Sequence, residues 1–73
     1  MHERIVIDPK TQHGKPVIRG TRVPVSRIVG GLAGGMTFDE VMAEYGVTME
    51  DIRAALEFAN QLIEQEEFHP LPV

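Results

Sequence analysis

The chain has 73 residues, a formal net charge of −4 and no cysteine. A chain of this length makes one domain and buries only about 60% of its unfolded surface on folding, and without cysteine it can form neither disulfides nor thiolate metal sites. No segment approaches the roughly 20 apolar residues that span a bilayer, and no charged-then-apolar leader precedes the domain. We therefore expect a cytoplasmic protein that is marginally stable alone and is reinforced by a second copy or a bound partner.

Charge is distributed unevenly along the chain. Residues 1–35 carry six cations against two carboxylates, a net of +4, whereas residues 36–73 carry one cation against nine carboxylates, a net of −8. Such asymmetry is typical of a basic surface for nucleic acid beside an acidic surface for a basic protein. Charge kept for solubility explains it equally well.

Residues 1–25 predict a β hairpin segment. A strand over residues 4–7 is followed by two short extended pieces, Val17-Ile18 and Arg22-Val23. These pieces flank a corner at Gly20, which we expect to have a positive φ. The prolines of this segment remove ladder donors, so its strands are edges and a wide sheet is excluded.

The apolar spacing becomes helical from Val25 onward. Apolar residues at i, i+3, i+4, i+7 and i+8 predict a helix over residues 26–34, with Ser26 as its cap. Gly30 and Gly31 weaken this helix and favour the close approach of a neighbouring helix. Because no strand leads into these glycines and no Gly-Lys-Ser/Thr follows them, we do not expect nucleotide binding or any other cofactor.

Two further helices are predicted in the acidic half. Thr37 and Glu40 form a capping box at the start of the second helix, and Gly46 supplies its left-handed stop. Thr48 then caps a third helix, which we expect to run from Met49 to Glu66. A short glycine-containing turn joins the two helices, as in a helix-turn-helix unit.

The third helix has a wider apolar surface than one small core needs. Its apolar residues cover an arc of roughly 200° at 100° per residue. One stripe consists of Ile52, Leu56, Ala59 and Ile63, and a second of Ala54, Phe58 and Leu62, with Ala55 between them. Two explanations stay open: the hairpin segment packs over the second stripe, or the excess is a surface for a second copy or a partner.

The chain lacks the motifs of known catalytic sites. Its three histidines, His2, His13 and His69, join no recognisable constellation. There is no cysteine nucleophile, no Gly-x-Ser-x-Gly and no His-Glu-x-x-His. We therefore expect a protein that is not an enzyme, holds no metal and takes no small-molecule substrate.

The order of motif pieces in the N-terminal half resembles a small prokaryotic family called domain of unknown function 433. The resemblance rests on Ile7-Asp8-Pro9, Gly14-Lys15-Pro16-Val17-Ile18 and Gly20-Thr21-Arg22-Val23-Pro24-Val25, followed by a glycine-containing helix and an acidic two-helix segment. It extends over about residues 5–62. It implies a homeodomain-like three-helix domain and, for many members, the antitoxin role in a VapBC-like pair whose toxin has a PIN-type ribonuclease fold. It carries no catalytic residues.

We thus expect a mainly α fold, in which residues 1–25 form the β hairpin segment, residues 26–67 a homeodomain-like three-helix unit, and residues 68–73 a tail. We interpret the protein as an antitoxin that occludes a PIN-type ribonuclease toxin. Apolar anchors within an acidic rim would meet a basic RNA-binding surface on the toxin. The partner-binding residues that we expect are Phe58, Leu62, Glu64, Glu67 and Phe68.

DNA binding is a further hypothesis. Homeodomain-like folds commonly read DNA with the third helix, but here three carboxylates surround the single cation Arg53 in the first half of that helix, and they oppose contact with phosphate. The cations that we expect to contact operator DNA, doubled in a homodimer, are Lys15, Arg19, Arg22 and Arg27. A stand-alone helix-turn-helix regulator is the alternative function, and a structural dimerisation module is the third.

Overall fold

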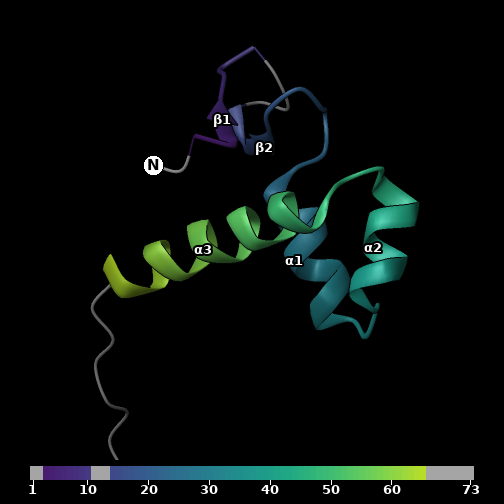
Figure 1. The fold of residues 1–73 in the computed structure, drawn as a ribbon. Coiled ribbons are helices and arrows are strands. Elements are labelled where there is room, and N and C mark those ends of the chain that lie inside the picture. The colour runs from purple at the N-terminus through teal and green to yellow at the C-terminus, as the bar shows by residue number, and fades with distance from the viewer. Residues whose placement is uncertain (1–2, 11–13, 66–73) are drawn as a thin grey trace, which may run out of the picture.

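A computed structural model of the chain describes residues 3–10 and 14–65. The elements, in chain order, are the strands β1 (Ile5–Ile7) and β2 (Pro16–Ile18) and the helices α1 (Val25–Ala33), α2 (Phe38–Tyr45) and α3 (Met49–Gln65). Figure 1 shows the hairpin of β1 and β2 on one side of α3, with α1 and α2 gathered near the start of that helix. The predicted fold class, mainly α with an N-terminal hairpin, is confirmed, and the homeodomain-like label stays a prediction.

The two strands pair antiparallel, with Ile5 opposite Ile18 and Ile7 opposite Pro16. The two pieces predicted around the corner lie against each other, since the Ile18 amide donates to the Val23 carbonyl at 3.0 Å and Val17 bridges Pro24, but Arg22-Val23 is not one of the named strands. The Thr21 hydroxyl donates to the Ile18 carbonyl at 2.8 Å and accepts from the Val23 amide at 3.0 Å. This side chain therefore satisfies backbone groups that a longer ladder would use. The predicted positive φ of Gly20 is confirmed at 79°.

Helix α1 begins one residue earlier than predicted. Pro24 is the N-cap, with extended backbone angles and no side-chain cap, so the expectation that Ser26 caps this helix is wrong. The Pro24 carbonyl already accepts from the Arg27 amide at 3.0 Å, which places Ser26 inside the first turn. The ring of a proline fixes its φ at a value that suits the residue before a helix, so the first turn of α1 closes without a hydroxyl cap.

The two interior glycines of α1 lie in different surroundings. A Cβ on Gly31 would lie 3.0 Å from the Met36 sulfur and 3.7 Å from the Tyr45 ring, whereas a Cβ on Gly30 would meet nothing within 4 Å. The close approach expected at both glycines is confirmed at Gly31 and wrong at Gly30. The absence of a side chain at Gly31 lets the end of α2 pack against α1.

The ends of α2 are as predicted. The Thr37 amide donates to Glu40 Oε1 at 2.8 Å, and the Glu40 amide donates to Thr37 Oγ1 at 3.0 Å, which completes the capping box. The hydrogen bond from the Thr37 backbone amide, and then that with the Thr37 side chain, hold the pKa of Glu40 below its ordinary value. Gly46 ends the helix with φ 66°, and α3 begins at Met49, as expected.

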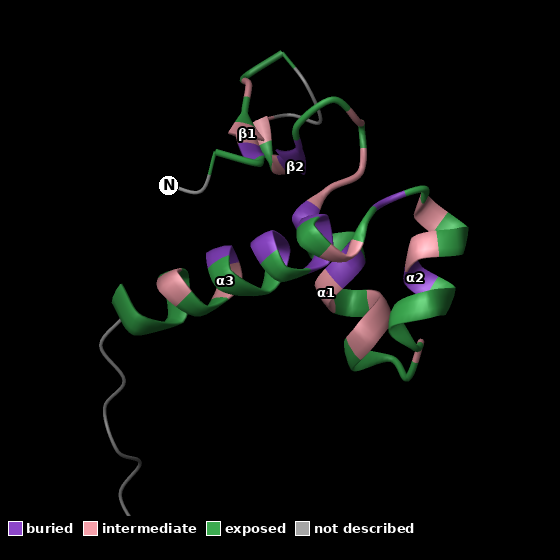
Figure 2. Ribbon diagram, in the orientation of Figure 1, coloured by how far each residue is buried: buried purple, intermediate pink, exposed green. Residues whose placement is uncertain are grey.

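The core collects side chains from every element. Its buried members are Ile5, Ile18, Val25, Ile28, Val41, Val47, Ile52, Ala54, Ala55 and Phe58. Figure 2 shows that burial on α3 is concentrated in the half nearer α1 and gives way to exposed residues toward the C-terminal end. The second stripe is thus covered as far as Phe58, but Leu62 is 48% exposed. The first explanation of the wide apolar surface therefore holds as far as Phe58, and a surface for a second copy or a partner beyond it stays a prediction.

Among residues 3–10 and 14–65, no helix combines the length and the apolar character needed to cross a bilayer.

Candidate functional site

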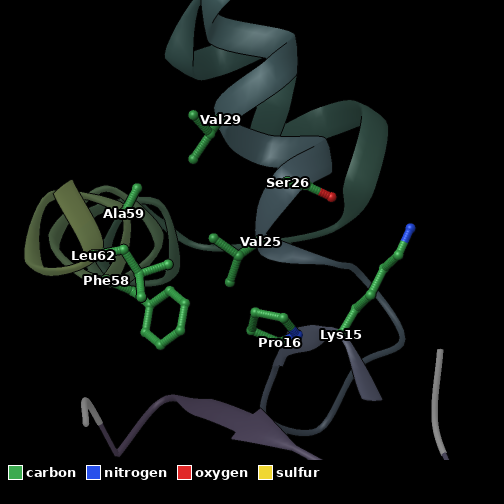
Figure 3. Close-up of a pocket in the computed structure, with 8 residues that line it drawn as sticks. All are labelled: Lys15, Pro16, Val25, Ser26, Val29, Phe58, Ala59 and Leu62. Carbon is green, nitrogen blue, oxygen red and sulfur yellow. The ribbon is translucent and has the colours of Figure 1, made fainter. Parts of the chain in front are cut away.

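An apolar groove lies between the hairpin, α1 and the C-terminal half of α3. One hollow of about 320 Å³ is lined by Lys15, Pro16, Val25, Ser26, Val29, Phe58, Ala59 and Leu62, and Figure 3 shows side chains from all three elements converging on it. A second hollow of about 280 Å³ is lined by Ile7, Phe58, Gln61, Leu62 and Gln65. Because Phe58 and Leu62 line both hollows, they form one surface, which we call the apolar groove.

The groove exists because α3 is longer than the elements packed against it. Its 17 residues rise about 1.5 Å each, and Figure 1 shows its C-terminal part projecting beyond α1 and α2. Leu62 on this projecting part and Ile7 on β1 are 48% and 44% exposed. An uncovered apolar surface of this kind, bordered by polar groups, is typical of a protein-binding site.

A cluster of polar groups, which we call the Asp51 cluster, attaches the hairpin to the start of α3. Asp51, only 9% exposed, accepts from the Thr48 amide at 3.0 Å through Oδ2 and from Arg4 Nη1 at 3.1 Å through Oδ1. Its own amide donates to Thr48 Oγ1 at 3.1 Å, as the predicted Thr48 cap requires. Since Arg4 precedes β1, the Asp51 cluster holds the β1 wall of the apolar groove in place.

The sequence-based interpretation treated Asp51 only as a charge that opposes DNA, and it missed this role. The signal was nevertheless in the sequence, because Thr48-Met49-Glu50-Asp51 has the Ser/Thr-x-x-Asp/Glu spacing of a capping box. No local pattern identifies Arg4 as the third member, since 47 residues separate it from Asp51.

The predicted partner-binding residues are only partly brought together. Phe58 is 8% exposed and belongs to the core, so it forms the floor of the groove rather than a protruding anchor. Leu62 lies at the exposed edge. Glu64 is exposed, but it follows Leu62 by two residues and therefore lies about 160° around the helix from it. The expected acidic rim around Phe58 and Leu62 is thus not formed by Glu64.

Glu67 and Phe68, the other two predicted partner-binding residues, lie outside the described residues, as do Glu66 and the predicted tail 68–73. The partner-binding role of all five residues stays a prediction.

The structure adds groove residues that sequence reasoning missed. Val25 and Val29 were recognised only as the core face of α1, and they also line the first hollow. Pro16 and Ile7 gave no signal, because their place beside α3 depends on how the hairpin folds over that helix.

The four predicted DNA contacts, Lys15, Arg19, Arg22 and Arg27, are all exposed. They lie between residues 15 and 27, from the residue before β2 to the first turn of α1. Arg19 Nε donates to the Glu3 carbonyl at 2.6 Å, and a further hollow of about 320 Å³ is lined by Glu3, Arg4 and Arg19. Contact of these cations with DNA stays a prediction.

Comparison with known proteins relates this architecture to sequenced relatives. The family described as "Protein of unknown function (DUF433)" matches residues 5–59. A Mycobacterium tuberculosis protein whose name reads "Putative antitoxin VapB45" is 42% identical over 53 residues, which are 73% of this chain and 22% of that protein. An uncharacterized protein of Archaeoglobus fulgidus is 65% identical over 23 residues, which are 32% of this chain and 64% of that protein.

Two crystal structures share the fold. A DUF433 member from Anabaena variabilis superposes with a TM-score of 0.78 at 38% identity, over 85% of this chain and 62% of that one. Rv2018 from Mycobacterium tuberculosis superposes with a TM-score of 0.65 at 42% identity, over 71% of this chain and 24% of that one. The chain thus spans less than a quarter of the length of both mycobacterial relatives. With most of its length matched, from the first strand through the middle of α3, this chain belongs to the DUF433 family.

Proposed function

We propose that this protein is an antitoxin that binds a PIN-type ribonuclease toxin through the apolar groove and neutralises it. The observation that carries the proposal is the uncovered groove, with Leu62 at its edge, in a chain that is 42% identical to a relative named as an antitoxin. The complex would form in the cytoplasm, where a ribonuclease meets its RNA. The resemblance noted for this family supports the PIN-type toxin as the partner.

The shape of the groove suits two apolar side chains of a toxin segment. Leu62 lies where the two hollows meet, so one side chain could enter on each side of it. Burial of apolar surface is worth about 25 cal/mol per Å², and polar groups around such a contact exclude water and orient the partner. Lys15 and Ser26 can fill that second role, since both line the first hollow (Figure 3).

The acidic half of the chain supports binding to a basic protein. Residues 36–73 carry a net charge of −8, and a surface of one sign accelerates encounter with a partner of the opposite sign. An RNA-degrading enzyme needs cations around its substrate channel. We therefore propose that the toxin docks with its RNA-binding surface against α3, so that RNA is excluded.

Leu62→Glu tests the proposal, with Ile63→Glu as the matched control. Both replace an exposed aliphatic residue of the same helical turn by a carboxylate, but only Leu62 lines the groove. We expect the neighbouring gene to encode the PIN-type ribonuclease, and we expect Leu62→Glu to weaken binding of that ribonuclease by at least about tenfold, equivalent to 1.4 kcal/mol, and to restore RNA cleavage. Ile63→Glu should bind as the parent does.

The readouts are titration calorimetry and RNA cleavage with the purified ribonuclease, and circular dichroism confirms that each variant is folded. Parent-like inhibition by Leu62→Glu would show that the groove is not the binding site. A neighbouring gene that encodes no PIN-type ribonuclease would contradict the finer identity of the partner.

We further propose that the protein represses its own operator through the exposed cations Lys15, Arg19, Arg22 and Arg27. Their exposure and the net +4 of residues 1–35 support this role. The double substitution Arg19→Ala with Arg22→Ala should weaken DNA binding and reduce the dependence of log K on log salt by about 2. Toxin binding should persist. Equal DNA affinity of parent and variant across a salt titration would exclude these arginines as phosphate contacts.

A further inference from the structure

A second apolar surface on α3 adjoins the apolar groove and shares Ala59 with it. Leu56, Ala59 and Ile63 form a line along the helix that we call the α3 seam. Leu56 is 36% exposed and Ile63 58% exposed, and neither lines the hollows of the groove. A partner seated in the groove would therefore leave Leu56 and Ile63 uncovered.

The seam has the spacing of helices that pack side by side. The steps from Ile52 through Leu56 and Ala59 to Ile63 are four, three and four residues, the alternation found where two helices interlock. Ile52 is fully buried in the protein's own core. The seam thus continues a core-forming line beyond the point at which the rest of the domain covers it. The small side chain of Ala59 at its middle allows a second helix to approach closely.

The charges beside the seam favour one orientation of a second copy. Arg53 and Glu64 are both exposed, and 11 residues at 100° each place them about 20° apart on the same side of the helix. In an antiparallel pair with a twofold axis near Ala59, Arg53 of each copy lies near Glu64 of the other. In a parallel pair the flank that carries Arg53 and Glu64 faces the opposite flank of the other copy, so these charges do not meet. Arg53 and Glu64 are therefore complementary to each other only in the antiparallel arrangement.

We propose that α3 of a second copy packs antiparallel on the α3 seam and forms a twofold-symmetric homodimer. The overlap from Arg53 to Gln65 corresponds to about 20 Å of helix. This contact is smaller than a standard protein interface, so dimerisation is expected in the micromolar range. The dimer forms without any toxin, and its existence does not depend on the proposed antitoxin function.

Sedimentation equilibrium of the full chain across the micromolar range tests the dimer. The parent should approach twice the monomer mass, and Ile63→Glu should weaken association at least tenfold while circular dichroism shows an unchanged helix content. Leu62→Glu, which alters the groove, should dimerise as the parent does. A parent that stays monomeric throughout the range, or an Ile63→Glu variant that dimerises equally well, overturns the proposal.

Charge reversal tests the orientation. Arg53→Glu and Glu64→Arg should each weaken the dimer, and the double variant should recover parental association because each copy again offers opposite charges. Since the chain has no cysteine, single cysteines report distances directly: Asn60→Cys, near the twofold axis, should form a disulfide-linked dimer, whereas Arg53→Cys should not. Efficient cross-linking of Arg53→Cys, or no recovery in the double variant, overturns the antiparallel arrangement. A dimer that passes these tests but binds no ribonuclease would refute the proposed function alone.

Discussion

Replacement of Asp51 by alanine should be among the most destabilising single changes to a polar residue of this protein. The Asp51 carboxylate accepts from the Thr48 amide at the start of α3 and from the Arg4 guanidinium beside β1. Alanine removes both bonds at once. The Thr48 amide then loses its partner at a position where the replaced side chain was only 9% exposed.

The expected loss can be estimated from these contacts. Loss of a helix-capping hydrogen bond costs about 1 kcal/mol. The ion pair with Arg4 adds less than about 1 kcal/mol, because the arginine side chain is 46% exposed and solvent screens it. The negative charge in the first turn of α3 contributes about 0.5 kcal/mol through the helix dipole. The free energy of unfolding should therefore fall by about 2 kcal/mol, which lowers Tm by roughly 8 to 16 °C for a domain of this size.

The assay is urea and thermal denaturation followed by circular dichroism. Asp39→Ala is the matched control, since Asp39 is also in the first turn of a helix but is exposed and not part of a capping box. Asp51→Asn should lose about half as much stability, because the amide oxygen still accepts from Thr48. Arg4→Ala combined with Asp51→Ala should be non-additive. If Asp51→Ala lowers the free energy of unfolding no more than Asp39→Ala does, the Asp51 cluster contributes nothing to stability and does not hold the hairpin.

Gly30→Ala should raise the free energy of unfolding by up to about 1 kcal/mol, because alanine is the better helix former and its Cβ meets no atom within 4 Å. Gly31→Ala should gain less, since its Cβ would lie 3.0 Å from the Met36 sulfur; equal gains in urea denaturation would contradict the close packing seen there. The lowered pKa of Glu40 means that its carboxylate stabilises the fold above the ordinary value of 4.5 and that this contribution disappears as the pH falls through the lower folded-state pKa. Glu40→Gln keeps an acceptor for the Thr37 amide and should flatten the loss of stability with acid over that range, and an unchanged pH profile would argue against the capping box as its source.

The features that sequence reasoning predicted correctly depend on neighbours within one turn. The capping box of α2 joins residues three apart, and the left-handed stop at Gly46 depends on one residue's freedom to adopt a positive φ. The starts of α2 and α3 follow from such contacts. Where two neighbouring residues could each serve as the N-cap, the prediction could be wrong. At α1 the N-cap is Pro24 and not Ser26.

Remote contacts decided the rest. Periodicity marked both Phe58 and Leu62 as apolar residues of one stripe, but only the position of the hairpin and α1 makes the first a buried floor and the second an exposed edge. In the same way, Ile7 meets the end of α3 from more than 50 residues away. The sequence by itself thus determined the helices, the caps of α2 and α3 and the family, because these depend on local hydrogen bonds and side-chain order. Only the tertiary structure decided which apolar side chains stay uncovered, because exposure depends on how far each distant element reaches along α3.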